Sequence, residues 1–208
     1  MYRTITVERE FGCGAGEIAG LLARRLNWKL WDRALTEEIA KLADVDCSTV
    51  ESCDERVDST FYRLARVFWR GSYERTSPLA STFDADCMVP LVQKTLQQAA
   101  EEGNSVIVGR GAPYFLRDRS DTFHVFLYAP RAEKLRRLLA SGRGPEESEE
   151  LLDTVDRDRA LFVKKYYGAD WPTRSLYHMM LNTAIGNENV ISTILSSLQL
   201  LTGQAAKV

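Results

Sequence analysis

The sequence predicts an α/β fold in which parallel strands form the central sheet. Three short stretches rich in β-branched and aromatic residues have the pattern of strands: Tyr2–Glu8, Asn104–Gly109 and Thr122–Pro130. Stretches in which apolar residues recur at helical spacing lie between and after them. Strands that alternate with helices in this way are typical of parallel sheets, and a glycine-rich loop after the first strand fits the same fold class.

The composition limits the classes of function. The 208 residues are enough for one domain, 1–208, with or without an inserted lobe. The net charge of −2 argues against general binding to nucleic acids or membrane surfaces, because such binding favours an excess of basic residues. No apolar run approaches the length of a membrane span, and the first strand begins without the apolar region of a signal peptide. The expected location is therefore cytoplasmic.

A metal site built from side chains is not expected. The four cysteines have no C-x-x-C spacing, and only His124 and His178 are available to complete a ligand set. Cys13 lies in the glycine loop, where the start of a helix could lower the pKa of its thiol. The simpler interpretation of Cys13 is a small residue that fills the loop.

The first strand, the loop and the first helix together indicate an anion site. The loop Arg9–Glu17 has glycines at alternate positions, and Ile18–Leu26 follows with an apolar helical face. Glycines allow the backbone to approach a ligand, successive N–H groups can point inward, and the helix N-terminus attracts phosphate. The alternative is a tight turn between strand and helix that binds no ligand.

The loop departs from the consensus phosphate loop, G-x-x-x-x-G-K-[ST]. If Gly14 is the second glycine of that consensus, Arg9 stands at the first glycine and Ala15 stands at the lysine. Gly16 and Glu17 follow, so the hydroxyl that usually binds Mg²⁺ is missing.

The second strand is expected near Trp28–Trp31, followed by a helix whose N-cap is Thr36. Asp32 and Arg33 lie at this junction, where a parallel strand would open onto a ligand cleft. A surface ion pair is the alternative for these two residues. A helical insertion rich in arginine is expected over residues 46–86, and its arginines form either a solvated face or a cleft for an anionic substrate.

Arg110 is the strongest functional candidate from local sequence. A helix over Cys87–Gly103 leads into the buried strand Asn104–Gly109, and Arg110 follows between Gly109 and Gly111. Open α/β sheets bind ligands just past the carboxyl ends of such strands. The alternative is a structural ion pair with a nearby carboxylate.

The last third of the chain continues the alternation. His124 is interpreted as a packed core histidine in its strand, and a helix over Arg131–Gly142 follows. The charged helix Pro145–Gly168 suits a lid, although a solvated, salt-bridged helix would explain the same charges. A final strand is expected over Leu176–Ala184, then a helix from Asn187 to Leu201.

In this order, the motifs resemble the cytidylate kinase-like proteins, which are relatives of nucleoside monophosphate (NMP) kinases within the P-loop class. The resemblance covers nearly the whole chain and rests on these stretches: ITVEREFGCGAGEIA, WDRALTEEIA, SVIVGRGAPYFL, VFLYAPRAEKLRR, DRDRA with YYG, and YHMMLNTAIGNE.

The resemblance implies a three-layer P-loop kinase fold with five parallel strands. Its core would comprise residues 1–45 and 87–208, with an NMP-binding insertion over 46–86 and a lid over 141–168. It also implies ATP and Mg²⁺ as cofactors and a small nucleotide as the substrate partner.

The resemblance also assigns roles to residues. The triphosphate of ATP would bind at the loop residues Gly12, Cys13, Gly14, Ala15, Gly16 and Glu17. The acceptor nucleotide would be bordered by Asp32 and Arg33, its phosphate would be held by Arg110, and Arg136 would lie near the base of the lid. The transferring phosphoryl group would meet the catalytic residues Arg9, Arg157 and Arg159, which must supply the charge of the missing lysine.

Two hypotheses of different classes follow. The first is an ATP-dependent kinase that acts on a nucleoside monophosphate, CMP-like, or on a similar small phosphate acceptor. The second is a nucleotide-binding regulatory protein that has lost kinase activity, which Ala15 favours. The retained arginines favour the first hypothesis, and a purely structural α/β domain would leave the glycine loop and Arg110 without a purpose.

Overall fold

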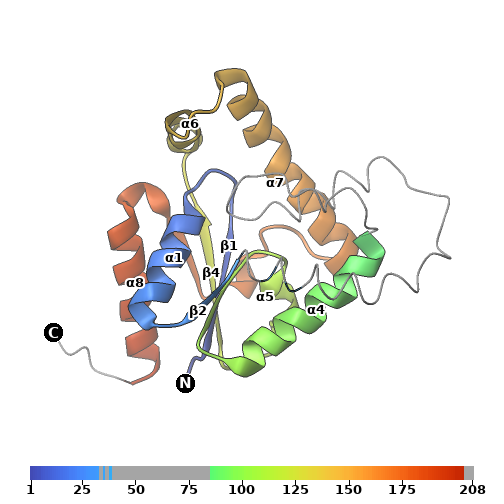
Figure 1. Ribbon diagram of the computed structural model, residues 1–208, viewed down its shortest axis with the longest axis vertical. Coiled ribbons are helices and arrows are strands. Elements are labelled where there is room, and N and C mark those ends of the chain that lie inside the picture. Colours follow the sequence, from blue (N-terminus) through green and yellow to red (C-terminus); the bar gives the residue numbers. More distant parts are fainter. Residues whose placement is uncertain (33–34, 36–37, 39–84, 204–208) are drawn as a thin grey trace.

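The computed structural model describes residues 1–32, 35, 38 and 85–203, and its centre is a five-stranded parallel sheet (Figure 1). The strand order is β2-β3-β1-β4-β5. The strands are β1 (Thr4–Arg9), β2 (Lys29–Trp31), β3 (Ser105–Val108), β4 (Thr122–Tyr128) and β5 (Met179–Asn182). The predicted five parallel strands are thus confirmed.

Helices cover both faces of the sheet and complete three layers. Helices α1 and α8 pack on one face, α4 and α5 on the other, and α6 and α7 lie beyond the carboxyl ends of the strands (Figure 1). The described helices are α1 (Ala15–Leu26), α4 (Ala85–Glu102), α5 (Ala112–Phe115), α6 (Arg131–Ala140), α7 (Pro145–Tyr167) and α8 (Asn187–Leu201), with short 3₁₀ turns η3 (Arg174–Leu176) and η4 (Thr183–Ile185).

Three predicted features differ from the structure or lie outside the described residues. The last strand is shorter than the predicted Leu176–Ala184, because η3 and η4 occupy most of its two ends. The predicted insertion over 46–86 lies outside the described residues, except that 85 and 86 begin α4. The predicted N-cap Thr36 also lies outside them.

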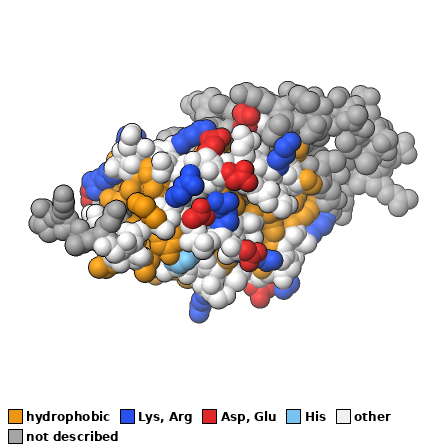
Figure 2. All heavy atoms as spheres, turned by 90° about the horizontal axis from the view of Figure 1, so that it is seen from below, with side chains coloured by type: hydrophobic (Ala, Val, Ile, Leu, Met, Phe, Trp, Pro, Cys, Tyr) orange, Lys and Arg blue, Asp and Glu red, His pale blue; other side chains and the backbone are white. Residues whose placement is uncertain are grey.

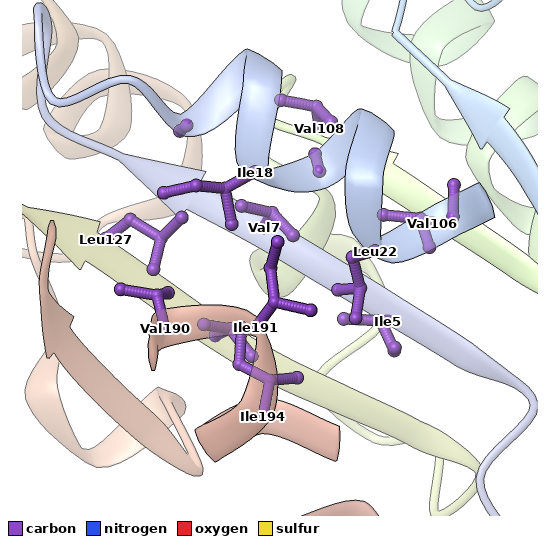
Figure 3. Packing of buried hydrophobic residues seen from close by; sticks show 14 of the residues in the cluster. Ile5, Val7, Ile18, Leu22, Val106, Val108, Leu127, Val190, Ile191 and Ile194 are labelled. Atoms are coloured by element: carbon purple, nitrogen blue, oxygen red, sulfur yellow. The ribbon is translucent and has the colours of Figure 1, made fainter. Parts of the chain in front are cut away.

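The main core lies between the sheet and the α1/α8 layer. Ile5 and Val7 of β1 point into it, together with Ile18 of α1 and Ile191 of α8, and all four are fully buried (Figure 3). Burying one such side chain contributes about 1.5–3 kcal/mol. Because successive side chains of a strand alternate between faces, Glu8 of the same strand belongs to the opposite face.

The surface at the amino ends of the strands is mixed in charge. Figure 2 shows acidic and basic side chains interspersed there, with apolar side chains between them. No helix in the described part of the chain is long and apolar enough to cross a bilayer.

Two histidines lie next to each other: His124 in β4 and His178 just before β5. His124 of β4 is 2% exposed, which confirms its interpretation as a core residue, and its Nδ1 lies 2.7 Å from Thr6 Oγ1. The backbone N–H of His124 donates to Nδ1 of His178 (3.0 Å), and the two rings stack with centroids 5.4 Å apart. Burial, and next the neighbouring His178, lowers the pKa of His124 to about 4 from 6.5.

This pKa predicts acid-sensitive stability. The unfolded chain takes up a proton at His124 below pH 6.5, whereas the folded protein resists it until about pH 4. The free energy of unfolding should therefore fall as the pH drops from 6.5 to 4, by up to about 3 kcal/mol from this residue. Chemical denaturation at several pH values measures the slope.

The variant His124→Asn keeps a polar atom near the position of Nδ1 but cannot titrate. It should be less stable at pH 7 and should lose stability less steeply toward pH 4. Equal slopes for the two proteins would contradict the assignment to His124.

Candidate functional site

The carboxyl ends of the parallel strands meet at one edge of the sheet, where open α/β sheets bind ligands. The glycine loop follows β1, Asp32 follows β2, and Arg110 follows β3. Thr183 follows β5 at the same edge. The residues that the sequence separates by up to 170 positions are thus brought together, as the hydrogen bond from Thr183 Oγ1 to the carbonyl oxygen of Cys13 shows (2.7 Å).

The glycine loop leaves the backbone N–H groups of the first turn of α1 without a side-chain cap. Gly12 and Gly14 have left-handed φ angles of +75° and +80°, and α1 begins directly after Gly14. As the N-cap, Gly14 has no side chain to bind the first N–H groups of the helix, so these donors are free of a side-chain cap. Gly16 and Glu17 lie inside the first turn of α1 rather than in the loop.

Cys13 is a packing residue of this loop. Its side chain is buried, its Sγ donates to the carbonyl oxygen of Leu127 (3.5 Å), and burial raises the pKa of its thiol to about 11. The effect of burial outweighs the lowering of this pKa that the start of the helix suggested. Only the backbone of Cys13 is suited to contact a ligand.

Helix α7 is tied to the glycine loop. The backbone N–H of Phe11 donates to the carboxylate of Asp156, at 2.9 and 3.1 Å from its two oxygens. Arg159 Nη1 donates to Asp156 Oδ1 (2.8 Å) and to the carbonyl oxygen of Arg9 (3.0 Å). The segment predicted as a lid is therefore bound to the loop through its central residues.

Three arginines lie at this edge: Arg9 and Arg110 are buried, and the side chain of Arg159 is 11% exposed. Burial, and next the charge of Arg9, lowers the pKa of Arg110 to about 10, and the same two causes lower the pKa of Arg159. Negative charge on Asp32 and Glu8 acts in the opposite direction on Arg110. The arrangement is a cationic cluster whose members repel one another, and such a cluster favours an anionic ligand.

Arg9 reaches from β1 to the turn after β3. Its backbone N–H and its Nη1 both donate to Oε1 of Glu8 (3.1 and 3.4 Å). Its guanidinium lies against Gly109, where an added Cβ would overlap Nη1 and lie 2.8 Å from Cζ. Glycine at position 109 therefore makes room for Arg9 beside Arg110.

The turn Gly109–Arg110–Gly111 has three consecutive left-handed residues, with φ angles of +66°, +61° and +67°. This conformation costs a non-glycine residue about 1–2 kcal/mol, so Arg110 is held in it by its surroundings. Such local strain is frequent at functional sites. Asp32 is buried near Arg110, so the candidate residues after β2 and β3 are brought together, while Arg33 lies outside the described residues.

Two predicted arginines lie apart from this cluster. The side chain of Arg136 is 67% exposed and forms two hydrogen bonds to Glu133 (2.8 and 2.7 Å). The side chain of Arg157 is 60% exposed and lies 3.9 Å from Asp158. The structure does not bring either side chain to the cluster. The roles proposed for Arg136 and Arg157 stay predictions.

Arg137, the neighbour of Arg136, contacts the glycine loop instead. Its Nη1 donates to the carbonyl oxygen of Cys13 and to Thr183 Oγ1 (2.9 Å), and its Nη2 donates to the carbonyl oxygen of Thr183 (3.0 Å). A Cβ on Gly14 would lie 2.8 Å from Nη1. The sequence offers the pair Arg136-Arg137 without showing which of the two faces the loop.

Known proteins share this fold and parts of this sequence. A cytidylate kinase of Methanosarcina mazei is 29% identical over 98 residues, which are 46% of this chain and only about half (53%) of that protein. An uncharacterized protein from Eubacterium ventriosum has a similar structure, with a TM-score of 0.67 and 18% identity over 94% of this chain and 98% of its own.

A shikimate kinase from Acinetobacter baumannii is similar in fold, with a TM-score of 0.53 and 18% identity, covering 100% of this chain and 97% of its own. These likenesses support the P-loop kinase fold. The sequence model of the Cytidylate kinase-like family matches residues 4–185, which extend from β1 to η4. The chain belongs to the Cytidylate kinase-like family.

Proposed function

We propose that the protein transfers a phosphoryl group from ATP to a nucleoside monophosphate, CMP-like, or to a similar small phosphate acceptor. The observation that carries this proposal is the cluster of the buried Arg9 and Arg110 and the largely covered Arg159 beside an uncapped glycine loop. Membership of a kinase family supports nucleotide kinase activity in general.

ATP would bind with its phosphates at the loop residues Gly12, Cys13 and Gly14 and at the first turn of α1, which contains Ala15, Gly16 and Glu17. The left-handed glycines let the backbone approach a phosphate, and the uncapped N–H groups of α1 suit its oxygens. Mg²⁺ would arrive with ATP and neutralise part of the phosphate charge. The residues that the structure describes contain no cluster of three or more metal-binding side chains, so the phosphates would be its main ligands.

The arginines would supply the positive charge of the missing lysine. Phosphoryl transfer spreads negative charge over the equatorial oxygens of the moving group, and preorganised cations stabilise that charge. Arg9 and Arg159 lie next to the loop, and Arg110, which lies near Asp32, would hold the phosphate of the acceptor.

Replacing Arg110 tests the acceptor side. Arg110→Ala should weaken CMP binding by about 10- to 100-fold, because a hydrogen bond to a charged group contributes about 1.5–3 kcal/mol. Calorimetric titration with CMP and a coupled assay of ADP formation measure binding and transfer. Arg117→Ala is the control, because that side chain is 62% exposed and pairs only with its neighbour Asp118 in the described structure.

A loss of thermal stability with unchanged CMP affinity would show that Arg110 is structural. Wild-type protein that binds ATP and CMP but forms no ADP would instead favour the regulatory hypothesis.

Gly109→Ala tests whether phosphoryl transfer depends on the position of the Arg9 guanidinium. The added Cβ would displace the guanidinium of Arg9, so we expect the rate of transfer to fall by roughly 10²–10³-fold, as for one lost preorganised donor. Arg9→Ala should have an effect of similar size, and the double variant should be little worse than either single one.

Gly203→Ala is the matched control for backbone strain. Gly203 has a similar φ of +70°, but nothing lies within 4 Å of an added Cβ, and it follows α8 far from the site. Equal rate losses in the two glycine variants would mean that strain, not the displacement of Arg9, causes the effect.

A further inference from the structure

Aromatic side chains form a wall beside Arg110. Tyr114 of α5 and Tyr167 at the end of α7 stack with their centroids 4.9 Å apart and their planes at 4°. Phe115 meets the ring of Tyr167 edge-on at 5.1 Å. These contacts fix the ring of Tyr167, so the position of its hydroxyl is fixed as well.

The hydroxyl of Tyr167 lies against the turn that carries Arg110. A Cβ on Gly111 would overlap the Oη of Tyr167 and lie 2.8 Å from its Cζ. Gly109, on the other side of Arg110, is packed against the guanidinium of Arg9 in the same manner. The two glycines thus let a guanidinium and a phenol approach the backbone on either side of Arg110.

This hydroxyl has no hydrogen-bond partner in the described part of the chain, although its oxygen is buried. A buried hydroxyl without a partner destabilises a fold, so each such group in a native structure needs an explanation. Burial, and next the charge of Glu8, raises the pKa of Tyr167. The group is therefore a neutral O–H donor at neutral pH.

The surroundings favour an anion as the missing partner. Arg9, Arg110 and Arg159 are donors with positive charge, and a phosphate monoester offers several oxygens that only accept. The phenol O–H against Gly111, next to Arg110 in the chain, would add one more donor for such a group. A cationic ligand would be repelled by the three arginines.

We propose that Tyr167 is a ligand-binding residue whose hydroxyl donates a hydrogen bond to the phosphate of the acceptor at Arg110. This inference rests on the proposed function for the identity of the acceptor. The anion site itself is testable without transfer, because inorganic phosphate carries the same oxygens.

The experiment compares wild-type protein, Tyr167→Phe and the control Tyr2→Phe. Tyr2 packs its ring on Phe123 (5.2 Å) at the start of the chain, away from Arg110. Calorimetric titrations with CMP and with inorganic phosphate give the dissociation constants. Thermal unfolding without ligand gives Tm, and the ADP assay reports transfer.

Tyr167→Phe should bind CMP and phosphate about tenfold or more weakly, since a hydrogen bond to a charged group is lost. Its Tm without ligand should be unchanged or higher, because phenylalanine fills the same space and no internal hydrogen bond is removed. This combination separates a binding role from a structural role, which would lower Tm. Tyr2→Phe should leave both dissociation constants unchanged.

Unchanged affinities for both probes in Tyr167→Phe would overturn the inference, and continued ADP formation would leave the proposed function intact. Phosphate binding that depends on Tyr167, without transfer to any nucleoside monophosphate, would support Tyr167 and overturn the proposed function. Wild-type protein that binds neither CMP nor phosphate would overturn both.

Discussion

Mutual repulsion among the clustered guanidinium groups of Arg9, Arg110 and Arg159 is the constraint around which the carboxyl edge of the sheet is arranged. Burial and the charge of Arg9 lower the pKa values of both Arg110 and Arg159. Removing like charges from water is costly, so the fold pairs Arg9 with Glu8 and Arg159 with Asp156, and Gly109 leaves room for the guanidinium of Arg9. Holding these like charges together costs stability, as expected of a preorganised anion site such as the one proposed.

Helix α7 links the two halves of this edge. Asp156 and Arg159 bind the glycine loop, and Tyr167 packs on the turn of Arg110. Eleven residues of helix separate Asp156 from Tyr167, which corresponds to about 16 Å. A single helix therefore contacts both the loop where ATP is proposed to bind and the turn proposed for the acceptor, and movement of α7 would alter both at once.

The sequence predicted what depends on local pattern. The strands, the loop and Arg110 follow from side-chain periodicity and glycine positions, which act over a few residues. Arg137 was missed in favour of Arg136, because adjacent helical residues point about 100° apart and the sequence does not reveal which face of α6 meets the loop. The contact of Arg9 with Gly109 depends on the pairing of β1 with β3, which joins segments about 100 residues apart.

The position of Arg9 offers a physical answer to the missing lysine. In the consensus loop the strand ends in glycine and the cation stands at the start of the helix. Here the strand ends in Arg9, the helix starts with the small residue Ala15, and the glycine that makes room lies on the neighbouring strand end at Gly109. Guanidinium is planar and broad, so it needs that open backbone where an ammonium would not. The guanidinium of Arg9 thus lies on the side of Arg110 rather than at the helix start, and its charge would stand between the loop and the proposed acceptor side of the site.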